Sequence, residues 1–411
     1  VFGLGSVLAA FAQNADQLIA LRAVMGIGGA MIMPATLSVL TDVFPRGERA
    51  KAMAIWSAVA GMGAGLGPFV GGLLIEYTDW TGVFWLNVPI AAVAIAGAIV
   101  YVPESRDPQP GRFDIPGALL SMAALSSLVY AIIEAQERGW TDSLVLGCFG
   151  AAFVVGGLFA WWELTTKHPM LPMRFFRDAS FSVGSIGIGL VFFAMMGASF
   201  AMTQYLQFAH GYSALESGAA MLPMALGVAM GSGLSAKLAA KVGAPRVIST
   251  GLTLIAVLLL CCVVWTPSTP LWIFCVVLFG LAYAMGLVMA PSTESVMNSV
   301  PEAKAGVGSA MNDVTRQVAG ALGVAIVGSI LGSYYAGHMP ADAPEAATDS
   351  IGAAYAVGDP ALIDTANRVF TDAMGVGLFA AVAAALIGAI LVAIKLPDPR
   401  EKLAPAPAMA T

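Results

Sequence analysis

The sequence predicts an all-α integral membrane protein, and its composition is the first reason. Hydrophobic residues make up 58% of the 411 residues, charged residues make up 11%, and the mean hydropathy is +0.83. Soluble domains carry about 25% charged residues, so this chain has too few polar residues to cover its surface in water. Lipid is therefore its expected solvent. Apolar runs of helix length and a one-sided distribution of basic residues are the second and third reasons.

Twelve apolar segments can be marked at about the 20-residue length that a membrane-spanning helix requires. They are rich in Ala, Gly, Val and Leu and lack the two-residue alternation of barrel strands, so helices are predicted. The first segment is short and lacks the basic flank of a signal peptide, which indicates a helix already in progress. The predicted spans are 1–12 (incomplete), 17–40, 49–76, 83–103, 115–133, 143–164, 181–206, 216–236, 247–265, 271–294, 306–334 and 370–395.

Basic residues fall almost entirely in alternate connections between these segments. Of the 19 lysines and arginines, only Arg138 and Arg368 lie in connections of the opposite side, and only Arg22 and Arg316 lie within helices. Cytoplasmic loops carry the excess of basic residues, so the pattern supports the segment count and an orientation in which the first segment runs outward. The longest outside connection, 335–369, is acidic and is expected to be a flexible surface loop.

Patterns of catalytic and metal-binding residues do not occur in the sequence. It holds no HExxH, no paired aspartate site and no serine with a neighbouring base, which argues against a membrane-embedded enzyme. No CxxC spacing or Cys/His cluster occurs, so neither a disulfide framework nor a zinc site is indicated. No cofactor, metal or nucleic-acid partner is expected. The cysteines all lie in apolar runs, at Cys148, Cys261, Cys262 and Cys275.

A glycine-rich stretch, "GMGAGLGPFVGG", lies inside the third apolar segment. Lipid gives helices no hydrophobic reason to associate, so small residues that allow close backbone contact form helix interfaces. A proline removes a backbone hydrogen bond and bends the helix. No GxxxxGK[ST] pattern follows a strand, so a nucleotide loop is not indicated. The stretch predicts a kinked, closely packed helix, with packing residues Gly63, Gly67, Pro68, Gly71 and Gly72.

Four motifs resemble the fourteen-spanner drug/proton antiporter family of the major facilitator superfamily. "GAGLGPFVGG" (63–72) matches its G-x-x-x-G-P-x-x-G-G signature, and "RAVMGIGGA" (22–30) resembles its fourth-helix arginine motif. "DWTGVFWLNVP" (79–89) resembles the W-R-x-x-F-x-x-N-x-P pattern, with Thr81 in place of the usual arginine. "GSAMNDVTRQVAGALG" (308–323) resembles the thirteenth helix of that family.

The resemblance implies a 6+2+6 arrangement of helices, seen here as 4+2+6. The glycine-proline motif falls on the third segment instead of the fifth, so we expect two helices to precede the first residue. Residues 1–103 would then be the remainder of an N-terminal six-helix bundle. Residues 104–180 would be two extra central helices with their linkers, and 181–411 would be the C-terminal six-helix bundle.

The resemblance also implies proton-coupled efflux of drugs or other amphipathic small molecules across the cytoplasmic membrane by alternating access. The expected partners are an amphipathic or cationic substrate, protons and membrane lipid. An uptake symporter or uniporter on the same fold remains open, as does an inactive or sensor fragment. These alternatives stay open because only the glycine-proline resemblance separates export from uptake.

Ionisable residues inside the membrane are costly and are functional candidates by default. Arg22 either snorkels to the outer interface or lines the translocation pathway and couples proton binding to conformational change. Asp313 and Arg316 lie three residues apart and share a helix face. They form either a self-neutralising pair that fastens the helix or a coupling site in which Asp313 carries a proton.

A run of adaptable and aromatic side chains in the seventh segment predicts a cavity for bulky apolar cargo. Methionine suits promiscuous binding sites because its side chain is flexible and polarizable. Lipid-facing or core packing is the alternative for the same side chains. The candidate cavity residues are Met195, Met196, Phe200, Gln204 and Tyr205.

Overall fold

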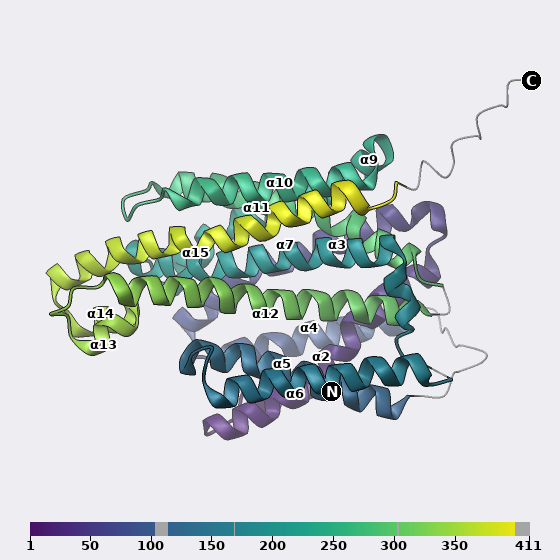
Figure 1. The fold of residues 1–411 in the computed structure, drawn as a ribbon, viewed down its shortest axis with the longest axis horizontal. Coiled ribbons are helices and arrows are strands. Elements are labelled where there is room, and N and C mark those ends of the chain that lie inside the picture. Colours follow the sequence, from purple (N-terminus) through teal and green to yellow (C-terminus); the bar gives the residue numbers. More distant parts are fainter. Residues whose placement is uncertain (103–113, 168, 302–303, 399–411) are drawn as a thin grey trace, which may run out of the picture.

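A computed structural model describes residues 1–102, 114–167, 169–301 and 304–398 of the chain. The described residues form helices joined by short connections, and 11 of these helices are long and apolar enough to cross a membrane. Most of the long helices run side by side in one bundle (Figure 1). The predicted all-α membrane fold is therefore confirmed. Residues 104–113 of the predicted central segment lie outside the described residues.

The N-terminal part of the bundle consists of α1 (Phe2–Ala9), α2 (Ala15–Val43), α3 (Arg46–Tyr77) and α4 (Gly82–Tyr101). The first predicted span is thus helical over only 8 residues, too short to cross a membrane. A hydrogen bond connects α1 to α4: the Ser6 hydroxyl donates to a backbone carbonyl of α4 at 2.8 Å. α3 packs against helices of the C-terminal part, and α2 packs against α12 (Ala305–His338).

A helical hairpin, α5 (Ile115–Arg138) and α6 (Ser143–Thr165), follows. It lies on the opposite side of the bundle from α10 in Figure 1, and α5 contacts α12. Asp114 caps α5 and also accepts a 2.9 Å hydrogen bond from the indole nitrogen of Trp162, which joins the two helices at this end. At the other end Gly139 adopts φ +90°, a conformation that favours glycine, and closes the turn.

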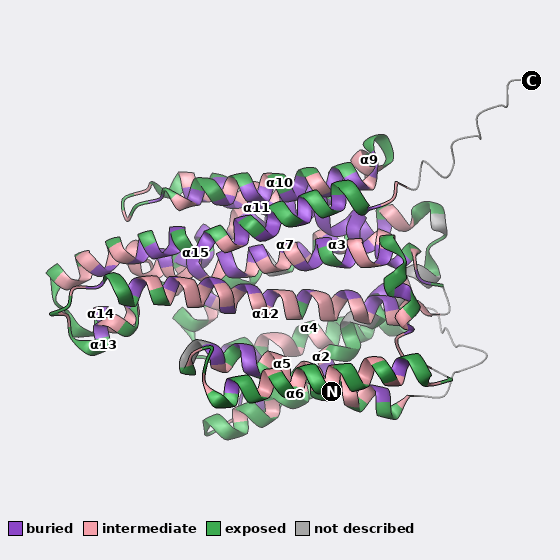
Figure 2. Cartoon of the chain, in the orientation of Figure 1, coloured by how far each residue is buried: buried purple, intermediate pink, exposed green. Residues whose placement is uncertain are grey.

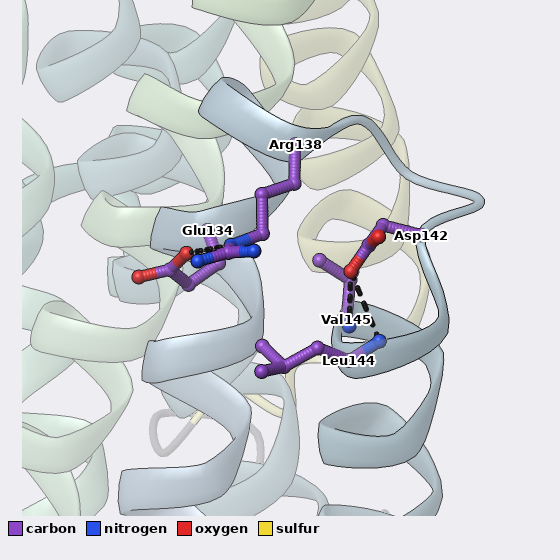
Figure 3. Close-up of polar contacts among 5 residues, drawn as sticks. All are labelled: Glu134, Arg138, Asp142, Leu144 and Val145. Carbon is purple, nitrogen blue, oxygen red and sulfur yellow. Dashed lines mark hydrogen bonds and ion pairs between the residues drawn. The ribbon is translucent and has the colours of Figure 1, made fainter.

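The turn of this hairpin is held by local polar contacts (Figure 3). The Arg138 guanidinium lies 2.6 Å from a carboxylate oxygen of Glu134, one helical turn earlier. The Asp142 carboxylate accepts hydrogen bonds from the backbone nitrogens of Leu144, at 2.9 Å, and Val145, at 3.4 Å. An N-cap of this kind satisfies backbone donors that the first turn of α6 leaves free. The hairpin therefore has a closed and well-defined tip.

The C-terminal part contains the main buried core, to which α7, α10, α11, α12 and α15 all contribute. Figure 2 shows this burial along α7 and α12, whereas α6 is largely exposed and α5 is partly exposed, as expected for helices that face lipid. The elements are η1 (Met173–Arg177), α7 (Ala179–Gln204), η2 (Tyr205–Ala209), α8 (Ala214–Ala220), α9 (Leu222–Val242), α10 (Ala244–Val263), α11 (Leu271–Asn298), α12, α13 (Glu345–Asp349), α14 (Ile351–Val357) and α15 (Pro360–Lys395).

One sequence prediction about this part is corrected by the structure. The predicted flexible loop 335–369 is largely helical, because α12 and α15 extend into it and α13 and α14 lie between them. The Tyr335 hydroxyl donates a 3.2 Å hydrogen bond to the carbonyl of Ala347, and Ala347 is buried. The predicted span 216–236 lies within one candidate membrane span, Ala214–Val242, in which α8 and α9 join at Met221 just before a proline.

Candidate functional site

A close seam joins α3 to α8 and α9 and connects the N-terminal part to the C-terminal part. A β-carbon added at Gly65 would lie 2.5 Å from the backbone nitrogen of Ala225. One added at Gly72 would lie 2.5 Å from the carbonyl oxygen of Ala214. The approach is reciprocal, because a β-carbon at Gly218 would lie 2.5 Å from the carbonyl oxygen of Pro68. Only glycine permits backbones to approach this closely.

The glycines that form the seam are not all those that the sequence predicted. Gly63, Gly67 and Gly71 have open space where a β-carbon would stand, so they make no close backbone contact in this structure, and their packing role stays a prediction. Helical geometry explains the difference, since Gly63 is about 200° around the helix from both Gly61 and Gly65. The seam follows positions 61, 65, 68 and 72, so it includes Pro68 and Gly72.

Arg316 of α12 occupies a buried site where the two parts meet. Its side chain is 5% exposed, and Nη2 donates a 3.0 Å hydrogen bond to the hydroxyl of Thr293 on α11. The guanidinium carbon lies 5.2 Å from the ring centroid of Trp56 on α3 and 5.4 Å from that of Phe192 on α7. Cation–π attraction of this kind strengthens when the groups are removed from water. Four helices thus converge on one cation.

Asp313 does not neutralise this cation directly. Its side chain is only partly buried, and within the described residues it makes no ion pair with Arg316 shorter than 4 Å. The hydrogen bond that Arg316 makes goes to Thr293 instead. The self-neutralising pair considered from the sequence is therefore wrong in its direct form. Arg316 remains a buried cation beside aromatic rings, with a carboxylate on the same helix one turn away.

A stripe of buried polar side chains continues from Arg316 along α12. Ser309 and Asn312 are both fully buried, and the side-chain polar atoms of both lack a protein hydrogen-bond partner among the described residues. Nε of Arg316 is in the same situation. Buried polar groups without partners are rare because each costs about 1–3 kcal/mol. The stripe therefore marks a polar interior that the packing alone does not explain.

The structure does not join Arg22 to this site. Arg22 is exposed on α2, and within the described part of the chain no hydrogen bond or ion pair links it to Asp313 or Arg316. The glycine motif that follows it does make a contact, because a β-carbon at Gly28 would lie 2.5 Å from the backbone nitrogen of Phe2. The motif therefore packs α1 against α2, and Arg22 lies on a different face.

The five predicted cavity residues do not line one cavity. Met195 and Tyr205 are buried in the core, and the Tyr205 hydroxyl donates a 2.7 Å hydrogen bond to the carbonyl of Thr266. Met196 packs against Gly320, where an added β-carbon would lie 3.0 Å from its Cγ. These three side chains pack between helices in this structure, and their cavity role stays a prediction.

The other two predicted residues, Phe200 and Gln204, do line a pocket of about 460 Å³. The pocket lies near the ends of α7 and α12 that meet α13 and α14. Trp140 of the α5–α6 turn forms another wall, and its indole nitrogen donates a 2.8 Å hydrogen bond to the hydroxyl of Ser329. The pocket thus combines aromatic and polar groups from three parts of the chain.

Comparison with known proteins identifies the family of the chain. The sequence model of the Major Facilitator Superfamily matches residues 1–324. The chain belongs to the Major Facilitator Superfamily. With its many apolar spans it is a multi-pass protein of the cell membrane, as the sequence predicted.

Relatives in the superfamily carry names that refer to drug resistance. "Multidrug resistance protein Stp" of Mycobacterium tuberculosis (strain ATCC 25618 / H37Rv) is 32% identical over 355 residues, 85% of this chain and 65% of that protein. "Multidrug efflux pump LfrA" of Mycolicibacterium smegmatis is 33% identical over 401 residues, 94% of this chain and 79% of that protein. The chain thus spans about two thirds of the length of Stp.

Solved structures of the superfamily share the fold. The human organic anion transporter MFSD10 (TETRAN) superposes with a TM-score of 0.59 at 16% identity, over 95% of this chain and 74% of that one. A bacterial homolog of the human lysosomal transporter Spinster gives a TM-score of 0.52 at 20% identity, over 95% of this chain and 79% of that one. At these identities the similarity concerns the fold alone.

Sequence reasoning missed Trp56, Thr293 and Asn312. Trp56 lies a full turn before the glycine motif on α3, and its indole nitrogen donates a 3.3 Å hydrogen bond to the hydroxyl of Thr36 on α2. Asn312 could have been found, because it precedes Asp313 and lies on the same helix stripe as Arg316. The role of Thr293 depends on how α11 meets α12, and no local pattern indicates it.

Proposed function

We propose that the protein is an efflux transporter that exports amphipathic or cationic small molecules in exchange for protons. The names of Stp and LfrA support this proposal, as does the glycine-proline motif of α3. The structural observation that carries it is the contact between Arg316 of the C-terminal part and Trp56 of the N-terminal part. A buried cation held by aromatic rings at the junction of two bundles can respond to a change in charge nearby.

Two contacts between the parts lie at different depths along α3. Trp56 meets Arg316 about a third of the way along α3, whereas Gly72 meets Ala214 near its end. They are about 24 Å apart along the helix axis at 1.5 Å per residue. Alternating access requires that contacts on one side of the membrane close while those on the other side open. We infer that these two contacts are the opposing closures.

Asp313 is the residue that we propose carries the proton in the C-terminal part. Its partly buried carboxylate lies one helical turn from Arg316 and beside the unpaired Asn312. When the carboxylate is charged, it balances part of the field of the guanidinium, and protonation removes that balance. The contact of Arg316 with Trp56 would then change in strength with the protonation of Asp313. Arg22, exposed on α2, is retained as a second candidate coupling residue.

The direction of transport distinguishes this proposal from uptake. Everted membrane vesicles that contain the protein would be incubated with ethidium in the external medium, and a proton gradient, acidic inside, would be imposed. Export by proton exchange predicts dye accumulation that collapses when nigericin removes the gradient. Dye entry that stops at equilibrium and is independent of the gradient would indicate a uniporter, and dye entry that the gradient opposes would indicate a symporter. The Arg316→Ala variant should accumulate less than a tenth as much dye, a loss of the kind expected when a buried charge network is broken.

A further inference from the structure

An apolar cleft lies between the α5–α6 hairpin and α12. Its volume is about 1060 Å³, and it is separate from the Arg316 site and from the pocket at Gln204. Leu128 of α5 and Phe153 of α6 form one side, and Val314 of α12 forms the other. Met173 and Phe176 of η1 close one end. α6 is largely exposed (Figure 2), and its lining residue Phe153 is 85% exposed, so the cleft lies toward the lipid and not in the centre of the bundle.

The cleft has the depth of one leaflet of the bilayer. Along α6 it extends from Phe159, near the linker that leads to η1, to Phe149. This distance is about 15 Å at 1.5 Å per residue. Half of a hydrocarbon core of about 30 Å is also about 15 Å. A single acyl chain that enters from the η1 end would therefore reach the bilayer centre within the cleft.

Basic side chains gather at the η1 end of the cleft. Arg174 and Arg177 are exposed and alternate with the lining residues Met173 and Phe176. Lys304 directly precedes α12, and its ammonium group donates a 3.2 Å hydrogen bond to the carbonyl of Pro169. This bond holds the linker before η1 against the start of α12, so all three cations flank one opening. Among the described residues, neither arginine forms an ion pair shorter than 4 Å.

The described acidic side chains at this end form no ion pair shorter than 4 Å with the three cations. Asp178 caps α7 through the backbone nitrogens of its first turn, and Asp114 caps α5. Glu163 is buried, and one carboxylate oxygen accepts a 2.9 Å hydrogen bond from the backbone nitrogen of Leu171. The two exposed arginines at the opening can therefore bind an external anion, and Lys304 adds positive charge beside them. Basic residues near a membrane surface attract anionic lipid headgroups.

We propose that this cleft binds an anionic phospholipid. One acyl chain lies between the hairpin and α12, and the phosphate group contacts Arg174, Arg177 and Lys304. The apolar walls and the leaflet depth account for the chain, and the three cations account for the headgroup. This inference does not depend on the direction or coupling of transport.

Native mass spectrometry of the full-length protein in detergent tests the headgroup contact. Phosphatidylglycerol and phosphatidylcholine with identical acyl chains would be added in competition. The wild type is expected to bind phosphatidylglycerol at least about 10-fold more tightly. The Arg174→Gln/Arg177→Gln double variant should lose this preference, whereas Arg246→Gln, an exposed arginine at the start of α10, should keep it. Equal binding of the two lipids by the wild type would overturn the proposal.

Variants that fill the cleft test the position of the acyl chain. Gly150→Leu and Ala310→Leu act from opposite walls, and an added β-carbon at Gly150 meets no atom within 4 Å. Gly157→Leu is the matched control, because Gly157 has the same open surroundings on α6 but does not line the cleft. Both cleft variants should bind phosphatidylglycerol about 10-fold more weakly than the control.

Two results would contradict the assignment of the cleft to lipid. One is wild-type lipid binding in both cleft variants, with melting temperatures that show each to be folded. The other is stoichiometric displacement of phosphatidylglycerol by ethidium, which would assign the cleft to a cationic cargo. A variant that fails to fold leaves the second cleft variant to decide, since the two substitutions lie on different helices.

Discussion

The guanidinium of Arg316 lies 5.2 Å from the ring centroid of Trp56, although 260 positions of sequence separate the two residues. Arg316 belongs to α12, and Trp56 belongs to α3, so the pair spans the junction between the two parts of the bundle. Trp56 is itself bonded to Thr36 of α2. One buried cation therefore couples the packing of helices on both sides of the junction.

Replacing Arg316 by lysine should impair transport although the charge is kept. Lysine has no planar fork to stack on Trp56 and Phe192 while it also binds Thr293. A double-mutant cycle with Trp56→Leu should give a coupling free energy of about 0.5–2 kcal/mol between the two side chains, measured by denaturant unfolding. Additive effects of the two substitutions would show that the ring and the guanidinium do not interact.

Gly65→Leu should separate α3 from α9 and lower both stability and transport. The added side chain would meet the backbone of Ala225, and overpacking of this kind costs about 1–3 kcal/mol. Gly67→Leu is the matched control, because a β-carbon there meets no atom within 4 Å. Melting temperature and dye efflux would be measured for both variants. A Gly67→Leu variant as defective as Gly65→Leu would contradict the seam described here.

Asp313→Asn should uncouple transport from the proton gradient without unfolding the protein. The substitution removes the titratable carboxylate but keeps a polar side chain of similar size at a partly buried position. Dye accumulation in everted vesicles should lose most of its dependence on the imposed gradient, and the melting temperature should stay close to that of the wild type. If gradient-driven efflux persists at the wild-type level, the proton is carried elsewhere.

Removing the carboxylate of Glu163 should destabilise the linker between α6 and α7. In Glu163→Ala the backbone nitrogen of Leu171, a partly buried residue, loses its acceptor, at a cost of about 1 kcal/mol. Glu163→Gln retains an oxygen that can accept this hydrogen bond and serves as the control. Denaturant unfolding followed by tryptophan fluorescence would compare them. Equal losses in the two variants would point to the negative charge instead of the hydrogen bond.

The turn before α4 should depend on pH. The Asp79 carboxylate accepts hydrogen bonds from the hydroxyl and the backbone nitrogen of Thr81, and these lower the pKa of Asp79 below its ordinary value. A group whose pKa is lowered in the folded state stabilises it above the unfolded pKa of about 3.9, and this contribution is lost as the pH falls through the folded pKa. Hydrogen exchange at the Thr81 amide should therefore show less protection at acidic pH.

Two variants define the origin of that effect. Asp79→Asn should show reduced protection at neutral pH and little further change with acid. Thr81→Val should raise the pKa of Asp79 toward its ordinary value, because the hydroxyl makes the largest contribution to the shift. An Asp79→Asn variant with the same pH profile as the wild type would assign the titration to another group.

The sequence by itself determined that the protein lies in a lipid bilayer, that it is helical, and approximately where each membrane span begins and ends. Runs of about 20 apolar residues have no stable alternative to a helix in lipid, because every backbone polar group must be bonded internally. The predicted span 143–164 thus became α6, Ser143–Thr165, and 271–294 became α11, Leu271–Asn298. The helices within 335–369 were missed, as was the break at Met221 inside the predicted span 216–236, because short helices depend on contacts that hydropathy does not report.

Only the tertiary structure decided which residues meet. The sequence showed that α3 is rich in glycine, but it could not show which face of α3 contacts another helix. Glycines at 61, 63, 65 and 67 place small residues on two faces of the helix. The position of α9 selects Gly61 and Gly65 for contact. Arg316 was likewise identified from the sequence, because placing a charged side chain inside the membrane costs free energy. Its partners Thr293 and Trp56, however, come from other helices. These contacts join different helices, so local sequence patterns do not predict them.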